Sequence, residues 1–498
     1  MPVIDERPPS TDVDLASATA TELVSRLEAR QVSSRELLDA QLDRIERLDP
    51  AINAVVALDV DRARQRAGSI DHARARGDQV GPLAGLPMTI KDSFETEGLV
   101  TTAGAGELAE HVPARDADAV ARLRGAGAVV FGKTNLPLYA GDWQTYNRVH
   151  GRTNNPWDVE RTAGGSSGGA AAAVAAGFST LELCSDIGGS IRVPAHYCGV
   201  FGHKPTWGAV PQRGHIPGPP GTLADADLGV MGPIGRSVAD LQLGLDVLVG
   251  DDLGGVPGGR LPDASPAVAS LDGCRVGVWL ENDVVPTSRD VLDVLRSLVD
   301  ALGDAGAAID EHTRPSTPVM TGVHLYDQLL MSVLGTGFPA ESLTAMNELA
   351  TTSAEDDDSE AVRIARAVTL SHRGWLAANE QRHRIAAEWD EVFEAIDVLV
   401  APVSPVTAFH HDTERPIEQR RLDVDGQLVP YRSHLVWSGL ATVPLLPATV
   451  VPAGRAPSGL PVGVQIIGPR WGDRTTLAFG LLVERLIGGF VPPPLTSR

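Results

Sequence analysis

Apolar residues recur every three or four positions near the start of the chain and predict two helices between Thr19 and Leu48. The S-x-x-E pattern at Ser33 and Glu36 is typical of a capping box at the start of the second helix. Leucines and isoleucines then follow at helical spacing, and Asp49-Pro50 is expected to end this helix.

Short apolar runs separate further helical segments and predict strands. A charged helix over 61–76 precedes "LPMTI", which is typical of a buried strand ending at Lys91. A helix, a glycine turn and a strand at 128–131 follow, and a long helix is expected over roughly 360–396. The runs "CRVGVWL", "IDVLVAP" and "LPVGVQIIGPR" predict later strands. This alternation favours an α/β fold with a mostly parallel or mixed sheet covered on both faces.

Composition and charge limit the function. The chain has 498 residues, of which 43% are hydrophobic and 21% charged, so it has enough apolar residues for a large core. Its net charge of −22 repels phosphate backbones and anionic membranes, which argues against nucleic acid and membrane partners. The N-terminus lacks the apolar segment of a signal peptide, and no apolar run reaches the ~18 residues of a membrane span. We therefore expect a cytoplasmic protein.

Two smaller features have ordinary interpretations. The three cysteines, Cys184, Cys198 and Cys274, are odd in number and widely spaced, so we expect reduced thiols in the core rather than disulfides. The acidic run "EDDDSE" (355–360) precedes the expected long helix, where negative charge favours the helix dipole, and we prefer this interpretation to a calcium site.

The segment "GAVVFGKT" (127–134) fits the phosphate-binding pattern G-x-x-x-x-G-K-[ST]. In a true phosphate-binding loop the four variable residues form the loop itself. Here they are Ala-Val-Val-Phe, which favours a strand, and no strong helix start follows Thr134. We therefore interpret Lys133 as an ordinary lysine at the end of a strand.

The segment "RTAGGSSGGAAAAVAAG" (161–177) satisfies G-x-S-x-G at both Ser166 and Ser167. A nucleophile elbow requires an apolar strand directly before the serine, but "NNPWDVERTA" predicts a loop there. The helix that follows carries small side chains on all of its faces. We expect it to pack tightly, with its N-terminal N–H groups facing the serines.

A third serine, Ser190, lies in "DIGGSIR". A serine that attacks an amide needs a base within hydrogen-bonding reach and N–H donors for the developing oxyanion. Glycines expose successive backbone N–H groups, which makes an oxyanion hole plausible at Ile187, Gly188, Gly189 and Ser190. The base could be His196, His203 or a buried lysine of lowered pKa.

The string "GGSSGGAAAAVAAGFSTLELCSDIGGSIRVPAHYCGVFGHKPT" (164–206) resembles the signature segment of the amidase signature family, the Ser–cis-Ser–Lys hydrolases. The blocks "GPLAGLPMTIKDSF", "VVFGKTNLPLYA", "GPIGRSVADL" and "GLPVGVQIIGP" also resemble the family, in the family's order. The resemblance implies an α/β/α sandwich with a central mixed, mostly parallel, twisted sheet. It further implies a single domain over 13–498, with a signature core at about 80–240 and a variable, substrate-shaping region at about 250–430. Residues 1–12, before this domain, are expected from their own sequence to form a loose tail.

The resemblance implies a role for each matching residue. Ser190 is the nucleophile, Lys91 is the base in its neutral form, and Ser166 bridges them through a cis peptide bond from Gly165. The supporting positions are Ser167, Asp186 and Arg192. The small residues Ala140 and Gly141 match positions near the scissile bond and suggest room for a bulky leaving group. The mechanism leaves no role for His196 or His203.

The resulting expectation is a monomeric or homodimeric amidase without a metal or other cofactor. It would cleave the C–N bond of small-molecule substrates: linear amides, aryl acylamides or carbamates (urethanes). Esters, which are chemically easier to cleave, would be hydrolysed as a side activity. The alternative is a glutaminase-type amidotransferase subunit that works in a complex. The aromatic run "GDWQTYNRVHGRTNNPWD" favours the stand-alone enzyme.

Overall fold

The computed structural model describes residue 14 and residues 17–249 and 260–497, so the expected tail over 1–12 lies outside the described residues. Strands and helices alternate, as the apolar runs predict. The helices are α1 (Ala20–Glu28), α2 (Ser34–Ile52), α3 (Val60–Arg76), α4 (Asp118–Gly125), α5 (Gly168–Ala176), α6 (Arg192–Cys198), α7 (Val238–Val249), α8 (Arg289–Asp304), α9 (Val319–Leu334), α10 (Ala340–Thr352), α11 (Glu360–Val368), α12 (His372–Ala395), α13 (His434–Thr442) and α14 (Asp473–Ile487).

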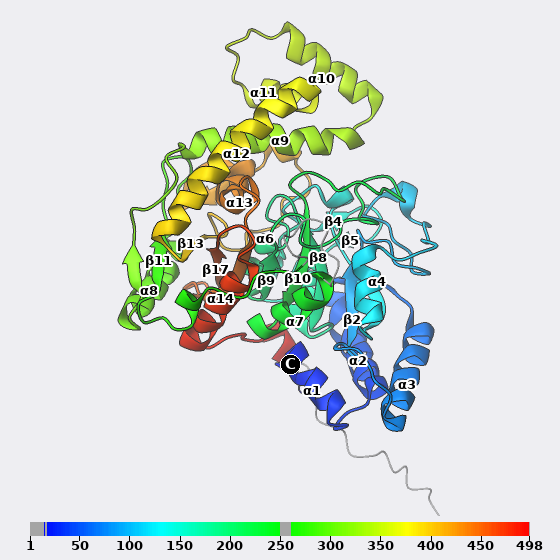
Figure 1. Cartoon of the computed structure of the whole chain (residues 1–498). Coiled ribbons are helices and arrows are strands. Elements are labelled where there is room, and N and C mark those ends of the chain that lie inside the picture. Colours follow the sequence, from blue (N-terminus) through cyan, green and yellow to red (C-terminus); the bar gives the residue numbers. More distant parts are fainter. Residues whose placement is uncertain (1–13, 15–16, 250–259, 498) are drawn as a thin grey trace, which may run out of the picture.

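The strands are mostly short. Their bounds are β1 (Val55–Leu58), β2 (Pro87–Lys91), β3 (Val129–Thr134), β4 (Tyr146–Asn147), β5 (Gly151–Arg152), β6 (Asn154–Asn155), β7 (Asp158–Thr162), β8 (Leu181–Asp186), β9 (Phe201–Lys204), β10 (Val230–Gly235), β11 (Arg275–Val278), β12 (Ala308–Asp310), β13 (Val398–Pro402), β14 (Arg421–Val424), β15 (Gln427–Pro430), β16 (Ala448–Arg455) and β17 (Pro461–Ile467). Within the described part of the chain, an 11-stranded sheet runs through the molecule in the order β1-β3-β2-β8-β10-β9-β16-β17-β13-β11-β12 (Figure 1).

The sheet is mixed, as expected, but it is not mostly parallel. Parallel pairing is confined to β3-β2-β8 and to β13-β11-β12. The centre, from β8 through β10, β9, β16 and β17 to β13, is antiparallel, and so is the edge pair β1-β3. Parallel pairs form where a helix crosses over between the strands, as α4 does between β2 and β3.

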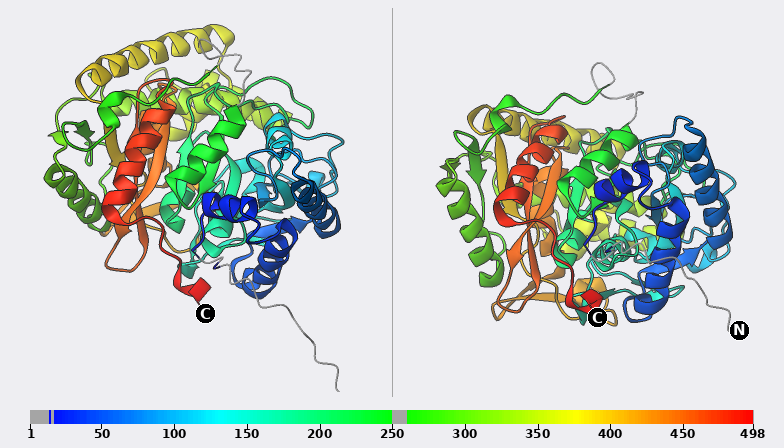
Figure 2. Two further views of the ribbon diagram at one scale, coloured as in Figure 1. Left: turned by 60° about the horizontal axis from the view of Figure 1, so that its bottom comes forward. Right: turned by 90° about the horizontal axis from the view of Figure 1, so that it is seen from below.

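Helices cover both faces of the sheet (Figure 2). On one face α14, α7 and α1 lie side by side, and α8 packs beside α14. The other face carries α5, α6 and α13, and α9 to α12 extend beyond α13 at the top of Figure 1. Because side chains alternate along a strand, Leu399 and Ala401 of β13 join one apolar core, whereas Val398 and Val400 join the other.

Three local predictions are wrong. Helix α2 continues through Pro50 to Ile52 and ends at Asn53, a C-cap residue in the left-handed conformation, so the proline lies in the last turn rather than after it. The expected long helix over 360–396 is two helices, since Ser371 caps a new helix start. The segment before the serines contains the small hairpin β6-β7 rather than only a loop, although its strands are polar and short.

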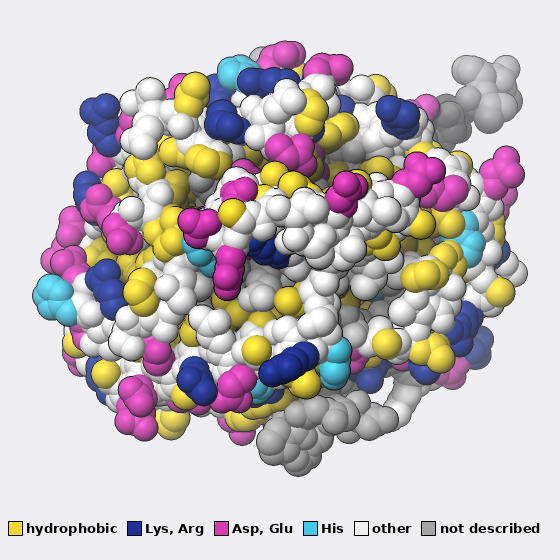
Figure 3. All heavy atoms as spheres, turned by 90° about the horizontal axis from the view of Figure 1, so that it is seen from above, with side chains coloured by type: hydrophobic (Ala, Val, Ile, Leu, Met, Phe, Trp, Pro, Cys, Tyr) yellow, Lys and Arg dark blue, Asp and Glu magenta, His cyan; other side chains and the backbone are white. Residues whose placement is uncertain are grey.

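The surface and the cysteines agree with the sequence. No helix among the described residues is long and apolar enough to cross a membrane. On the face viewed from above α9 to α12, acidic and basic side chains are interspersed rather than gathered into a basic surface (Figure 3). Cys184, Cys198 and Cys274 are buried and free, which confirms the expectation of thiols in the core.

Candidate active site

Lys91 ends β2, and its side chain is 0% exposed. Its Nζ donates hydrogen bonds to Ser166 Oγ at 2.7 Å and to Ser185 Oγ at 3.0 Å. Burial lowers the pKa of Lys91 to about 8, although the nearby Asp186 carboxylate opposes the shift. A useful fraction of this amine is therefore neutral near physiological pH.

The parallel pair β2-β8 brings the lysine and the serines together. Thr89 pairs with Glu182 and Ile90 with Leu183, so the two strands end at the same edge of the sheet. The loop after β8 carries Ser190 beyond that edge, the usual place for ligand sites in sheets with parallel strands.

Ser166 and Ser167 lie between β7 and α5, and both are fully buried. The peptide bond from Gly165 to Ser166 is cis, as the resemblance implies. Ser167 is the N-cap position of α5, and all nine residues of this helix are buried, which confirms the expected tight packing. The N–H of Ser167 donates to Ser190 O at 3.1 Å, so the two serine loops are joined through their backbones.

Ser190 is buried less completely than Lys91 and Ser166. It is 6% exposed, close to Ser185 at 5%, whereas Lys91 and Ser166 are 0% exposed. Within the described part of the chain its hydroxyl has no recorded hydrogen bond, while Ser166 is bonded directly to the lysine. The arrangement places the buried amine against the buried hydroxyl of Ser166, with Ser190 on the adjoining loop.

Asp186 and Arg192 hold the loop that carries Ser190. Asp186 accepts hydrogen bonds from the N–H groups of Gly189 and Ile191 at 2.9 and 3.0 Å, and Arg192 Nη2 donates to its Oδ1 at 2.9 Å. Burial raises the pKa of Asp186, but the Arg192 charge and these hydrogen bonds outweigh it and bring the pKa to about 2. Arg192 also donates to Ser438 O and Thr442 Oγ1 of α13. These bonds hold the loop in place, and the supporting role that the resemblance implies for Asp186 and Arg192 stays a prediction.

The four expected oxyanion donors are not equivalent. The N–H of Gly189 is bonded to Asp186 Oδ1 at 2.9 Å. For the N–H groups of Ile187, Gly188 and Ser190, no acceptor is recorded among the described residues. Two carbonyls of this loop accept hydrogen bonds from side chains outside it. Trp143 Nε1 donates to Gly188 O at 2.8 Å, and the Tyr326 hydroxyl donates to Ile187 O.

Ala140 and Gly141 precede a segment that touches the serine loop. Tyr139 and Ala140 both have positive φ angles, 49° and 57°. A Cβ built on Gly165 would lie 2.4 Å from Asp142 O, so the backbone of residues 142–144 packs directly on the residue before Ser166. The structure thus places Ala140 and Gly141 next to the site along the chain.

A buried ion pair holds that segment. Arg420 Nη1 donates to Asp142 Oδ2 at 2.6 Å, and the Tyr431 hydroxyl donates to Asp142 Oδ1 at 2.7 Å. Arg420 Nη2 also donates to the Tyr146 hydroxyl at 2.6 Å. Sequence reasoning missed this group, because its members lie far apart in the chain and form no local pattern.

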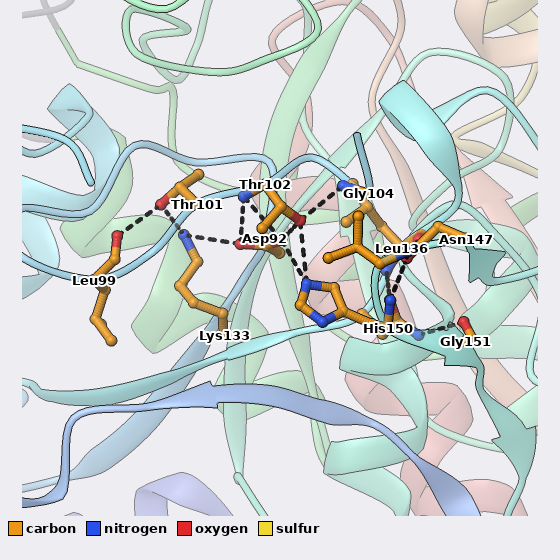
Figure 4. Close-up of polar contacts among 12 residues, drawn as sticks. Asp92, Leu99, Thr101, Thr102, Gly104, Lys133, Leu136, Asn147, His150 and Gly151 are labelled. Carbon is orange, nitrogen blue, oxygen red and sulfur yellow. Dashed lines mark hydrogen bonds and ion pairs between the residues drawn. The ribbon is translucent and has the colours of Figure 1, made fainter. Parts of the chain in front are cut away.

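Lys133 is at the end of β3, as predicted, but it is not an ordinary lysine (Figure 4). Its side chain is 0% exposed, and its Nζ donates to Phe94 O at 2.5 Å and to Thr101 Oγ1 at 3.0 Å. Asp92 Oδ1 lies 3.8 Å away and is bonded to Thr102. These contacts fix the segment that follows Lys91, so the phosphate-like motif serves to build the site.

The histidines near Ser190 in the sequence have structural partners. His196 Nδ1 accepts from Gly463 N at 2.7 Å, and burial lowers the pKa of His196 to about 4. His203 Nε2 lies 3.2 Å from Asp473 Oδ1, and both side chains are fully buried. Neither imidazole is bonded to Ser190. Among the described residues no group of His, Cys, Asp or Glu side chains is arranged to hold a metal ion.

Replacing Gly165 with alanine is expected to disturb the serine loop. The new Cβ would lie 2.4 Å from Asp142 O and 2.8 Å from Gln144 N, so the backbone must shift. We expect a loss of about 1–3 kcal/mol in the free energy of unfolding, measured with urea, together with lower hydrolytic activity. As a control, Gly68→Ala in α3 meets no atom within 4 Å and should not destabilise the protein. Unchanged stability and activity of the Gly165 variant would contradict this packing.

Comparisons with known proteins agree with the geometry. The family sequence model described as Amidase matches residues 36–477. The chain is 35% identical to a glutamyl-tRNA(Gln) amidotransferase subunit from Moorella thermoacetica, covering 95% of this chain and 97% of the relative. Among solved structures, it is similar to a bacterial aryl acylamidase of the amidase signature family, with a TM-score of 0.79 and 27% identity over 94% of this chain and 96% of that chain.

A second solved structure is the corresponding glutamyl-tRNA(Gln) amidotransferase subunit from Thermotoga maritima, with a TM-score of 0.76 and 26% identity over 97% of this chain and 99% of that chain. The match of the family model spans most of the sequence, including both serine loops and the strand that ends at Lys91. This chain therefore belongs to the amidase signature family of enzymes.

Proposed function

We propose that the protein hydrolyses linear amides, aryl acylamides or carbamates through an acyl-enzyme on Ser190. The observation that carries this proposal is the 2.7 Å hydrogen bond between Lys91 Nζ and Ser166 Oγ, on the loop whose Ser167 N–H donates to Ser190 O. A buried amine of lowered pKa is a suitable general base at neutral pH.

The chemical steps follow from this order of groups. Neutral Lys91 takes the proton of Ser166 as Ser166 takes the proton of Ser190, and Ser190 Oγ bonds to the substrate carbonyl carbon. The tetrahedral intermediate collapses as its C–N bond breaks, and the proton returns through Ser166 to the leaving nitrogen. Water then hydrolyses the acyl-enzyme and restores Ser190.

The negative charge on the carbonyl oxygen would be stabilised by backbone N–H groups of the same loop. Of the four expected donors, Ile187, Gly188 and Ser190 have N–H groups with no recorded acceptor among the described residues. The N–H of Gly189 instead holds Asp186. We assign the oxyanion to the first three groups and a supporting role to the fourth.

An uncharged substrate suits the surroundings. Both carboxylate oxygens of Asp142 are engaged, by Arg420 and by Tyr431, so this buried charge is already satisfied. An apolar pocket between α9, α12 and α13 is lined by uncharged residues that include Trp279, Ile385 and Trp389, but neither the serines nor the lysine of the site lines it. The preference for an uncharged amide or carbamate over a charged amino acid such as glutamine therefore rests on the satisfied charge of Asp142.

A second candidate is the glutaminase-type subunit of an amidotransferase. The observation that favours it is the 35% identity to the Moorella thermoacetica amidotransferase subunit over nearly the whole chain. This candidate predicts that the protein copurifies with a partner and hydrolyses glutamine efficiently only in that complex.

Turnover of a substrate panel separates the two candidates. The panel contains p-nitroacetanilide, an aryl carbamate and glutamine, each assayed with the purified chain alone. Hydrolysis of either aryl compound in preference to glutamine is expected. Turnover of glutamine alone, or only after a partner is added, would contradict the proposal and favour the amidotransferase function.

Activity is expected to rise with pH, to reach half of its maximum near pH 8 and to level off above that. Lys91 accepts a proton only when neutral, and its neutral fraction increases as the pH rises through its pKa of about 8. His196 does not contribute to this rise, because burial lowers the pKa of His196 to about 4. The measurement is kcat/KM for p-nitrophenyl acetate from about pH 6 to pH 9.

A control is needed because burial also lowers the pKa of Lys133 to about 8. In the Lys133→Met variant, kcat/KM should still rise with pH as it does in the unmodified protein. If this rise were lost in the variant, or if kcat/KM of the unmodified protein did not change with pH, the assignment to Lys91 would be contradicted.

A further inference from the structure

Resting on the proposed function, we propose that Tyr326 of α9 positions the oxyanion-binding N–H of Gly188. Tyr326 does not touch the reacting atoms, so it is a positioning residue rather than a catalytic one. It lies in the region of the chain that the sequence assigned to substrate shaping, outside the segments that carry the serines and the lysine.

The contact that carries this inference joins two distant parts of the chain. The Tyr326 hydroxyl donates a hydrogen bond to Ile187 O, in the loop between Asp186 and Ser190. The side chain is fully buried, and its ring lies against Gly439 of α13, where an added Cβ would be 3.0 Å from Tyr326 Cδ1. The ring is therefore held on one side by α13 while its hydroxyl meets the loop.

Because the peptide group is planar, the hydrogen bond to Ile187 O also orients the N–H of Gly188. In a trans peptide the C=O of one residue and the N–H of the next point in opposite directions. A bond to Ile187 O therefore fixes the direction of the Gly188 N–H, which has no recorded acceptor among the described residues. That free N–H is one of the groups assigned to the oxyanion.

The next peptide group, between Gly188 and Gly189, differs from the Ile187–Gly188 group in its hydrogen bonds. Its carbonyl, Gly188 O, accepts from Trp143 Nε1 at 2.8 Å, and its N–H, on Gly189, donates to Asp186 Oδ1 at 2.9 Å. That unit is held at both ends. The Ile187–Gly188 unit has Tyr326 as the partner recorded for its carbonyl, so its orientation depends more strongly on one hydroxyl.

The hydroxyl remains a donor throughout the working pH range. Burial raises the pKa of Tyr326 to about 12, so the phenol stays protonated at neutral pH. A protonated phenol donates to a carbonyl in the ground state and in the transition state alike. Its effect on the reaction is to hold the Gly188 N–H ready before charge develops.

The test is Tyr326→Phe, which removes the hydroxyl and keeps the ring. The matched control is Tyr197→Phe, since Tyr197 is also fully buried and its hydroxyl bonds Ser404 Oγ at 2.9 Å. With p-nitrophenyl acetate we expect kcat of Tyr326→Phe to fall about tenfold with KM nearly unchanged, less than the loss from deleting an oxyanion donor. The control should keep kcat within about threefold.

A second readout reports the oxyanion directly. Trifluoroacetophenone accepts Ser190 Oγ at its carbonyl carbon, the serine proton passes through Ser166 to Lys91, and the carbonyl oxygen becomes a hemiketal oxyanion. Its inhibition constant should rise about tenfold in Tyr326→Phe and not in Tyr197→Phe.

Each outcome bears on one claim. Equal kcat and equal inhibition constants in the Tyr326 and Tyr197 variants would overturn the positioning role. A change in KM alone would overturn it as well, because it would place Tyr326 in substrate binding. If the unmodified protein showed no Ser190-dependent turnover and no inhibition by the ketone, the proposed function itself would fail.

Discussion

Ser190→Ala is expected to lower kcat for amide and ester hydrolysis by about 10⁴-fold or more, because the proposed mechanism forms the acyl-enzyme on the hydroxyl of Ser190. The alanine keeps the Cβ and the backbone of the loop, and the N–H of Ser167 can still donate to the carbonyl of residue 190. The thermal stability of the variant should therefore stay close to that of the unmodified protein. Steady-state hydrolysis of p-nitrophenyl acetate and a thermal melt measure the two effects.

Ser93→Ala is the matched control for this variant. Ser93 is also buried and lies two residues after Lys91, but its hydroxyl has no hydrogen-bond partner among the described residues. Removing it should leave kcat within about threefold. Activity of Ser190→Ala within tenfold of the unmodified protein would require a different nucleophile.

Lys91→Met is expected to lower kcat by about 10³- to 10⁴-fold. Methionine fills similar space but cannot accept the proton of Ser166, so Ser190 loses the base that activates it. The effect on KM should be small, because Lys91 is fully buried and its Nζ is bonded to Ser166 and Ser185. The measurement is kcat and KM for p-nitroacetanilide.

Ser185→Ala provides the comparison for Lys91. Ser185 accepts the second hydrogen bond of Lys91 Nζ, at 3.0 Å, but it has no place in the proton path. We expect a smaller loss of kcat, about tenfold or less, from poorer placement of the amine. Full activity of Lys91→Met, or a larger loss in Ser185→Ala than in Lys91→Met, would contradict the assignment of the base.

Local patterns in the sequence predicted much of this architecture. The capping box at Ser33 and Glu36 starts α2, and both of its expected hydrogen bonds are present. The apolar run before Lys91 forms a fully buried strand that ends at this residue. Such features depend on neighbours in the chain, so propensity and periodicity identify them.

Features that depend on contacts between distant residues could not be predicted. The pairing of Arg420 with Asp142 and the bond from Tyr326 to Ile187 each join segments more than a hundred residues apart. The burial of Lys133 depends on how residues 92–102 fold over β3, which no local pattern encodes. The mostly antiparallel centre of the sheet likewise depends on which strands meet in space.

The most direct test of the central claim is the site of covalent labelling. The protein is incubated with an irreversible serine-directed fluorophosphonate, digested, and analysed by mass spectrometry of its peptides. The account predicts a single modified residue, Ser190, with labelling abolished in Ser190→Ala and strongly slowed in Lys91→Met. A label on Ser166, Ser167 or any other serine, or labelling at the normal rate in Lys91→Met, would contradict it.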